Sequence, residues 1–196
     1  AEAGYELTRE GCVPDVADAI ASALHDAVTT ADLVLTVGGL GPTRDDITRE
    51  AVASLLGLPI AHHAETEAHI RAFLARRNVT VPEEAILAQC RLPASVHVIP
   101  NRNGTAPGLW CETASHAVVA MLPGPPSELC PMFTEAILPR IRDRWPRLCA
   151  RRTIRVVGLP ESRVEQLIMP VVEGTPTVVP AYCAKPEGVM VRLTAN

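Results

Sequence analysis

A short apolar run that ends in a glycine-rich turn most constrains the fold of this chain. Leu33 to Val37 is almost wholly apolar and rich in β-branched residues, which is typical of a central strand covered on both faces. Residues 48–56 then place apolar side chains at the spacing of a helix with one buried face. The order of strand, turn and helix predicts an α/β domain whose turn lies at the carboxyl end of a parallel strand, where open sheets bind ligands.

The turn has the composition of an anion-binding loop. Gly38, Gly39 and Gly41 permit positive φ angles and leave no Cβ between the backbone and a ligand. The free N–H groups and the dipole at the start of the following helix favour a phosphate or a carboxylate. The turn is not the dinucleotide fingerprint, because Arg44 stands where that motif needs a glycine, and the chain contains no Gly-Lys-Ser/Thr sequence of a P-loop.

Two adjacent carboxylates, Asp45 and Asp46, follow the turn. One interpretation is structural: either carboxylate caps the next helix, with Thr43 and Asp46 at capping-box spacing, a device that stabilises by roughly 1 kcal/mol. The other interpretation is a cation site, because Mg²⁺ takes one or two carboxylates and completes its shell with water and phosphate oxygens. The residues alone leave both interpretations open.

A second loop, residues 101–108, follows a predicted strand at 96–99. Its glycines and asparagines are typical of a hairpin turn. The alternative is a ligand loop in which Asn103 and Thr105 hydrogen-bond a ligand and Gly104 lets the backbone approach it.

A third loop, residues 122–128, follows the apolar strand 117–121 and opens a long helix predicted to run from Glu128 to Trp145. Gly124 gives a ligand access to the backbone. Glu128 is either a partner of the helix dipole or a carboxylate that faces the ligand.

The three loops together resemble the CinA family of competence/damage-inducible proteins, in both order and spacing. The resemblance implies a three-layer, molybdopterin-binding-like (MoCF) α/β domain with a mostly parallel sheet over residues 1–147. It also implies a small α+β domain, often described as KH-like, over residues 148–196. The family begins with a strand that carries a Gly-Asp-Glu type motif, and we expect the present sequence to lack it. We also expect no counterpart of the family's C-terminal deamidase domain.

The resemblance implies a function as well. CinA proteins are expected to be metal-dependent hydrolases that cleave the pyrophosphate of ADP-ribose and related dinucleotides, using a divalent cation such as Mg²⁺ and a monovalent cation. The alternatives are a molybdopterin-binding or molybdenum-cofactor biosynthesis protein and a non-catalytic nucleotide-binding module. We expect a homodimer.

The expected site draws on all three loops. Asp45 and Asp46 are the expected catalytic residues and metal ligands. The residues expected to bind the phosphate or the rest of the ligand are Gly38, Gly39, Gly41, Pro42, Thr43, Thr48, Asn103, Gly104, Thr105, Gly108, Pro123, Gly124 and Glu128. Ala88 stands where the resemblance implies a basic residue, and this lost charge is expected to weaken phosphate binding or to change substrate preference.

The composition favours a cytoplasmic protein that binds neither nucleic acid nor membranes. The net charge of −4 disfavours a general nucleic-acid binder, although seven arginines lie between residues 140 and 155. We interpret these arginines as a helix end and a solvated linker. No apolar stretch approaches the roughly 20 residues that span a bilayer. At the N-terminus, Ala1 to Gly4 is predicted to end a helix and Tyr5 to Arg9 to form a strand.

Overall fold

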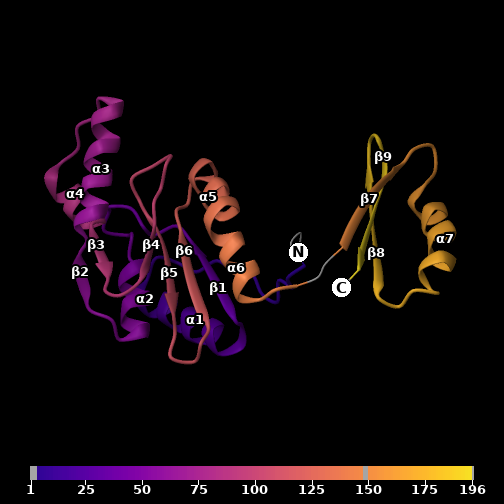
Figure 1. The fold of residues 1–196 in the computed structure, drawn as a ribbon, viewed down its shortest axis with the longest axis horizontal. Coiled ribbons are helices and arrows are strands. Elements are labelled where there is room, and N and C mark those ends of the chain that lie inside the picture. Colours follow the sequence, from indigo (N-terminus) through magenta and orange to yellow (C-terminus); the bar gives the residue numbers. More distant parts are fainter. Residues whose placement is uncertain (1–3, 148–149, 196) are drawn as a thin grey trace. The chain divides into compact units, whose positions relative to one another are not determined.

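The computed structural model describes residues 4–147 and 150–195, which form two compact units (Figure 1). The larger unit is Thr8–Asp143, and the smaller one begins at Arg144 and takes in the segment before Thr8. Most of the predicted helix end at residues 1–4 lies outside the described residues. The strand predicted at residues 5–9 is wrong, because this segment pairs with no strand in the described chain, and Tyr5 instead donates a hydrogen bond to the Trp145 carbonyl at 2.8 Å.

The larger unit contains a four-stranded sheet in the order β1-β6-β5-β4. β1 and β6 are parallel, while β5 is antiparallel to both β6 and β4. The strands are β1 (Leu33–Val37), β4 (His97–Ile99), β5 (Gly108–Glu112) and β6 (Val118–Leu122). The predicted α/β class is confirmed. The sheet is mixed because a hairpin of only a few residues joins β5 to β6, whereas a long crossover joins the parallel pair.

The expectation that β1 is a central strand covered on both faces is wrong. β1 lies at the edge of the sheet among the described residues. Leu35 and Val37 are accordingly 42% and 57% exposed. The apolar composition of the run indicated burial, but a single sequence does not show which strand will stand at an edge.

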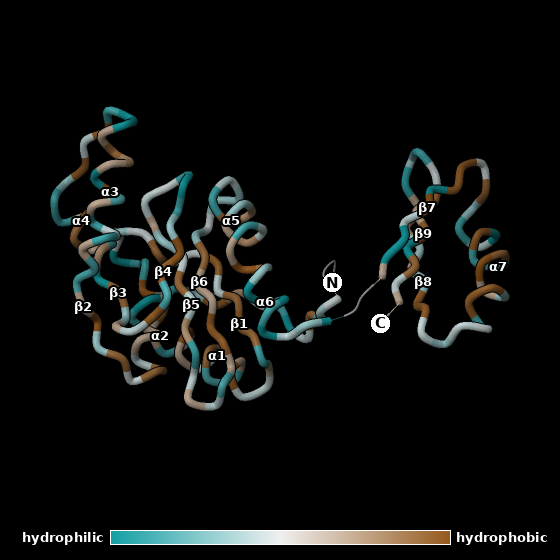
Figure 2. The backbone as a smooth tube through the Cα atoms, viewed as in Figure 1, coloured by the Kyte–Doolittle hydropathy of each residue, from teal (hydrophilic) through white to brown (hydrophobic). Residues whose placement is uncertain are grey.

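Helices cover both faces of the sheet and make three layers. α1 (Ala17–Thr30) and α2 (Thr48–Leu56) pack against one face, where Leu24 and Val52 share a core with Leu109. The adjacent Gly108 points to the opposite face, and a Cβ there would lie 2.4 Å from the Met132 sulfur. Hydrophobic residues accordingly run along β5 and β6 between the helical layers (Figure 2).

The helix after the third loop covers this second face and is built in three consecutive segments. They are α5 (Pro126–Met132), the π-helical turn η1 (Phe133–Ile137) and α6 (Leu138–Arg144). The Leu138 N–H donates to the Phe133 carbonyl across the wider turn. Pro139 follows directly and has no N–H to donate, so the π-helical turn accommodates a proline that an ideal α-helix would not. The predicted single helix is therefore present, with a local widening.

A helical pair extends from the larger unit between the first and second loops. α3 and α4 pack through Ile70, Ile86 and Cys90, which form a small separate core. Two short antiparallel strands, β2 and β3, flank the pair. The bounds are β2 (Ile60–His62), α3 (Ala64–Arg77), α4 (Glu83–Gln89) and β3 (Arg91–Pro93).

The smaller unit is an antiparallel sheet in the order β7-β9-β8 with one helix, α7, on one face. Val164 of α7 packs on Val189 and Val191 of β9. The bounds are β7 (Ala150–Val156), α7 (Glu161–Val172), β8 (Val178–Lys185) and β9 (Gly188–Ala195). The predicted α+β composition is confirmed. In neither unit is any described helix both long and apolar enough to cross a membrane.

Candidate functional site

The first and third loops meet because β1 and β6 are parallel and end at the same edge of the sheet. The Gly38 N–H donates to the Leu122 carbonyl at 2.9 Å, which continues the strand pairing into the loops. A Cβ on Gly124 would lie 3.7 Å from the Gly38 Cα. The two glycine backbones therefore approach each other so closely that a single added Cβ would fill the space between them.

The second loop is tied to the third by its asparagines. The Asn103 side chain donates from Nδ2 to the Ser127 carbonyl at 2.7 Å, and Asn101 Nδ2 donates to Glu128 Oε2 at 2.6 Å. A Cβ on Gly104 would lie only 2.1 Å from Glu128 Oε2. The Glu128 carboxylate thus lies against the glycine of the second loop, and the three loops form one continuous edge.

Asn101 is a residue of this edge that the sequence analysis missed. It is 1% exposed, its Nδ2 also donates to the Ala106 carbonyl at 2.8 Å, and its Oδ1 accepts from the Asn103 N–H at 3.0 Å. A buried amide with these partners fixes the path of the loop. The available signal was its position at the start of the loop, two residues after the end of the predicted strand at 96–99.

Within the first loop, Gly39 has a conformation and a neighbour that only glycine tolerates. Its φ is +67°, and a Cβ would lie 2.0 Å from Thr48 Oγ1. The Thr48 N–H in turn donates to the Gly39 carbonyl at 3.2 Å. Thr48 is 8% exposed, so its hydroxyl faces the glycine backbone inside the loop.

Thr43 links the two acidic residues. Asp46 Oδ2 accepts from the Thr43 N–H at 2.9 Å and from its hydroxyl at 2.6 Å, and the same hydroxyl contacts Asp45 Oδ1. The proposed capping role of the aspartates is wrong, because the N-cap of α2 is Ile47 and no side chain caps it. Asp46 closes the turn by accepting hydrogen bonds from Thr43, three residues earlier in the chain.

Asp46 is held in its ionised form. Partial burial by itself would raise its pKa, but hydrogen bonds from the Thr43 hydroxyl and N–H and from the Gly41 N–H, together with the charge of Arg49, lower it below its ordinary value. The carboxylate is therefore negatively charged across the neutral range.

Arg49 supports the first loop from beneath and is the second residue that the sequence analysis missed. It is 3% exposed, and its guanidinium donates to the carbonyls of Leu40 at 2.6 Å and Gly41 at 3.1 Å. It also reaches the Ala88 carbonyl at 3.4 Å, so an arginine lies against the position where a basic residue was expected. Burial lowers the pKa of Arg49. The sequence signal for a buried Arg49 was its position three residues before Val52, which places both residues on the same buried face of the helix.

The remaining predicted residues differ in exposure. Pro42 and Thr43 are exposed and Thr105 is half-buried, while Pro123 is buried beneath the exposed Gly124. Gly108 is buried in β5, where it makes room for Met132. Its role in the structure is packing.

The donor set of the acidic pair fits a hard cation bound largely through water and ligand. Thr43 engages one oxygen of each carboxylate, which leaves further acceptor positions on both. No group of three or more His, Cys, Asp or Glu side chains suited to a metal occurs within the described ranges. Two carboxylates without a third protein ligand match the way Mg²⁺ is held beside substrate phosphates, and they do not match a structural zinc site.

Comparison with known families decides the relationship. A family model described as "Probable molybdopterin binding domain" matches residues 1–143, and one described as "Damage-inducible protein CinA KH domain" matches residues 151–196. The chain belongs to the CinA family. Its relatives include a competence-damage inducible protein of Thermoanaerobacter pseudethanolicus, 40% identical over 178 residues, and one of Moorella thermoacetica, 39% identical over 200 residues. These matches cover 90% and 100% of this chain.

This CinA-family chain spans less than half of those curated relatives, 43% and 47% of their lengths. A solved structure of the protein CinA from Thermoplasma acidophilum is 33% identical, with a TM-score of 0.60. That match covers 73% of this chain and 80% of the solved one. The predicted family is therefore confirmed.

Proposed function

We propose that this CinA-family chain binds the diphosphate of a nucleoside diphosphate-linked substrate, such as ADP-ribose, at the joined edge of its three loops and hydrolyses it. The observation that carries the proposal is the close approach of the Gly38 and Gly124 backbones, with Glu128 against Gly104. These contacts bring glycine backbone from three loops to one edge, beside the ionised Asp46. Such an edge suits a ligand that carries phosphate and is bound together with a cation.

Asp45 and Asp46 would hold the divalent cation. A bound Mg²⁺ neutralises charge on the diphosphate and lowers the pKa of a coordinated water, which are general roles of metal ions in hydrolysis. Thr43 keeps the two carboxylates on the same side of the turn through its hydroxyl. Arg49 holds the carbonyls of Leu40 and Gly41 away from the phosphate by binding both of them.

The chemical change is a simple hydrolysis. A water oxygen forms a bond to one phosphorus, the bond from that phosphorus to the bridging oxygen breaks, and the departing phosphate carries the bridging oxygen away. The attacking water releases a proton to solvent. With ADP-ribose the products are AMP and ribose 5-phosphate. The Gly38 and Gly41 N–H groups are bound to Leu122 and Asp46, so the remaining N–H groups of the turn would orient the phosphate during this step.

The proposal is tested by following AMP release from ADP-ribose in the presence of Mg²⁺. We expect release by the parent chain and a loss of at least tenfold in the Asp46→Asn variant, which keeps the shape but removes the charge. Asp26→Asn, at an exposed carboxylate on α1, is the matched control and is expected to behave like the parent. An Asp46→Asn variant as active as Asp26→Asn would refute the metal assignment.

A pterin phosphate is the second candidate ligand, and the description of the matching family as molybdopterin-binding favours it. It would use the same glycine loops without need of hydrolysis. Pterin fluorescence that copurifies with the chain, together with no AMP release, would favour this candidate. A non-catalytic nucleotide-binding module would instead show stabilisation by ADP-ribose without turnover and without bound pterin.

A further inference from the structure

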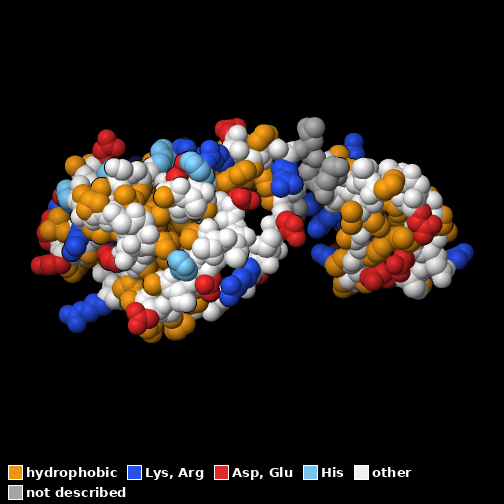
Figure 3. All heavy atoms as spheres, turned by 90° about the horizontal axis from the view of Figure 1, so that it is seen from below, with side chains coloured by type: hydrophobic (Ala, Val, Ile, Leu, Met, Phe, Trp, Pro, Cys, Tyr) orange, Lys and Arg blue, Asp and Glu red, His pale blue; other side chains and the backbone are white. Residues whose placement is uncertain are grey.

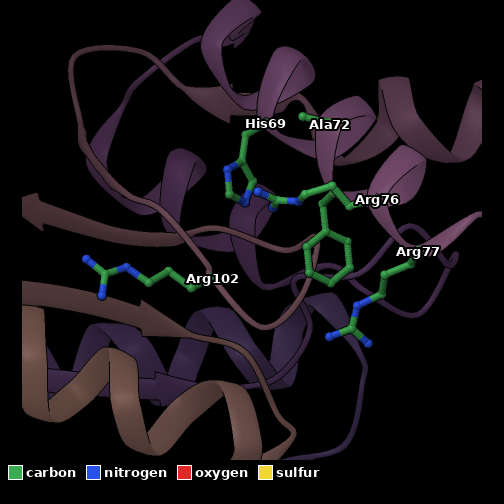
Figure 4. Close-up of a pocket in the computed structure, with 6 residues that line it drawn as sticks. His69, Ala72, Arg76, Arg77 and Arg102 are labelled. Atoms are coloured by element: carbon green, nitrogen blue, oxygen red, sulfur yellow. The ribbon is translucent and has the colours of Figure 1, made fainter.

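A basic hollow lies between α3 and the second loop, apart from the glycine edge. Its volume is about 460 Å³, and Figure 4 shows the side chains around it. The lining residues are His69, Ala72, Phe73, Arg76, Arg77 and Arg102. Three arginines and a histidine are thus among the residues that line one small volume, in a chain whose net charge is −4. On the face shown in Figure 3, by contrast, charged side chains of both signs are dispersed.

Two arginines of the hollow have no carboxylate partner, unlike another arginine on the same helix. Arg71 pairs with Glu67 at 2.7 Å and also contacts Glu83, so its charge is neutralised within the protein. Among the described residues, no carboxylate lies within 4 Å of the Arg76 or Arg77 guanidinium. Their donors remain free for an external anion.

The position of Arg77 is set by an aromatic ring. Its guanidinium carbon lies 4.7 Å from the centre of the Phe73 ring, and Phe73 is 8% exposed. Stacking on a buried ring restrains the guanidinium while its N–H groups keep their hydrogen-bonding capacity. The hollow therefore has one wall with an ordered cation.

Arg102 brings a cation from a different part of the chain. It belongs to the second loop, and its only described ion pair is an exposed contact with Glu135 at 3.1 Å, a type that contributes little stability. The loop is tied to α3 because His69 Nε2 donates to the Asn101 carbonyl at 2.7 Å. The helix dipole explains why cations occur in the last turn of α3, but it does not explain an arginine from another element at the same hollow.

We propose that this hollow is a second anion site, which binds the phosphate group of a small phosphorylated ligand. Guanidinium groups bind phosphate through short, charge-assisted hydrogen bonds, and the hollow is lined by two unpaired arginines of α3 and by Arg102 of the second loop, whose ion pair with Glu135 is exposed. The site does not depend on the proposed hydrolysis. It lies on the α3 side of the second loop, whereas the acidic pair belongs to the first loop.

The test is a titration of the ¹⁵N-labelled chain, followed by amide NMR at constant ionic strength, with inorganic phosphate in one arm and AMP in the other. We expect saturable shifts at Phe73, Arg76 and Arg102 in both arms if the phosphate group alone is recognised. Tighter binding of AMP, with additional shifts around the hollow, would identify a nucleotide as the ligand. Either result supports the site.

Variants distinguish specific binding at the hollow from nonspecific electrostatic attraction of the anion to the protein. Arg76→Gln combined with Arg77→Gln should weaken binding at least tenfold, while Arg71→Gln, which makes a single charge change on the same helix, should leave it within twofold. Asp46→Asn should not change binding at the hollow, which separates this proposal from the hydrolase. The absence of saturable shifts at the hollow, shifts confined to the glycine loops, or equal weakening by Arg71→Gln would overturn the proposal.

Discussion

Asn101 Nδ2 donates to Glu128 Oε2 at 2.6 Å and so joins the second loop to the helix that opens after the third. The same buried amide bonds to the Ala106 carbonyl and to the Asn103 N–H. Asn101 is therefore the residue on which the shape of this part of the site depends most.

Asn101→Ala should destabilise the chain by about 2–3 kcal/mol, because it leaves buried polar groups without partners. Asn103→Ala is the matched control. It removes one exposed hydrogen bond, to the Ser127 carbonyl, and should lower the free energy of unfolding by about 1 kcal/mol or less. Urea unfolding measures both. Equal decreases in the free energy of unfolding for the two variants would show that Asn101 does not organise the loop.

Gly39→Ala should be destabilising for two reasons, positive φ and a steric clash with Thr48. Gly57 offers a control, because its φ of +64° is nearly the same and a Cβ there meets nothing within 4 Å. We expect backbone strain to lower the free energy of unfolding by about 1 kcal/mol at either position, and the clash with Thr48 to make the total decrease larger at Gly39. Thermal unfolding of the two variants compares them. A loss at Gly39 no greater than at Gly57 would mean that the Thr48 hydroxyl moves aside freely.

Arg49→Met should lower the free energy of unfolding by about 1–3 kcal/mol, because the carbonyls of Leu40 and Gly41 lose their donor inside the protein. Arg44→Met, at an exposed position in the same segment, should change stability by less than about 0.5 kcal/mol. Denaturant unfolding provides the measurement. If the two variants are equally stable, Arg49 does not support the turn.

The hydrogen bonds to Asp46 predict a specific dependence of stability on pH. Its folded pKa lies below its ordinary value of 3.8, so ionised Asp46 stabilises the folded chain above that value, and this contribution is lost as the pH falls through the folded pKa. The difference in the free energy of unfolding between the parent and Asp46→Asn should therefore shrink as the pH is lowered from 5 toward 2.5. A difference that stays constant over this range would contradict the assignment.

The local elements of the fold were predictable because their signals are local. The strand at 33–37 and the helix at 48–56 were both identified with their bounds from the spacing of their apolar residues, and the structure adds Gly57 as the C-cap of the helix. The hairpin interpretation of the second loop agrees with the antiparallel pairing of β4 and β5. The edge position of β1 and the antiparallel pairing of β5 with β6 were not predicted, because they depend on contacts between strands that the local pattern does not specify.

The glycines of the site could be predicted from the sequence. The residues that hold its loops in place, Asn101 and Arg49, could not. Glycine turns after apolar strands mark a candidate loop directly. Asn101 and Arg49 act by binding carbonyls and carboxylates brought from other loops, and those partners become visible only in three dimensions. Asp46 shows the converse: its spacing from Thr43 suggested a helix cap, but its oxygen binds back to Thr43 instead.

The most direct test of the joined site is an amide NMR titration of the chain with ADP-ribose and Mg²⁺ at low temperature. If the three loops form one diphosphate site, the N–H signals of Gly38, Gly104 and Gly124 should shift together and saturate at a single ligand concentration. Shifts that are absent from these glycines, or that saturate at a different concentration for each loop, would contradict this claim.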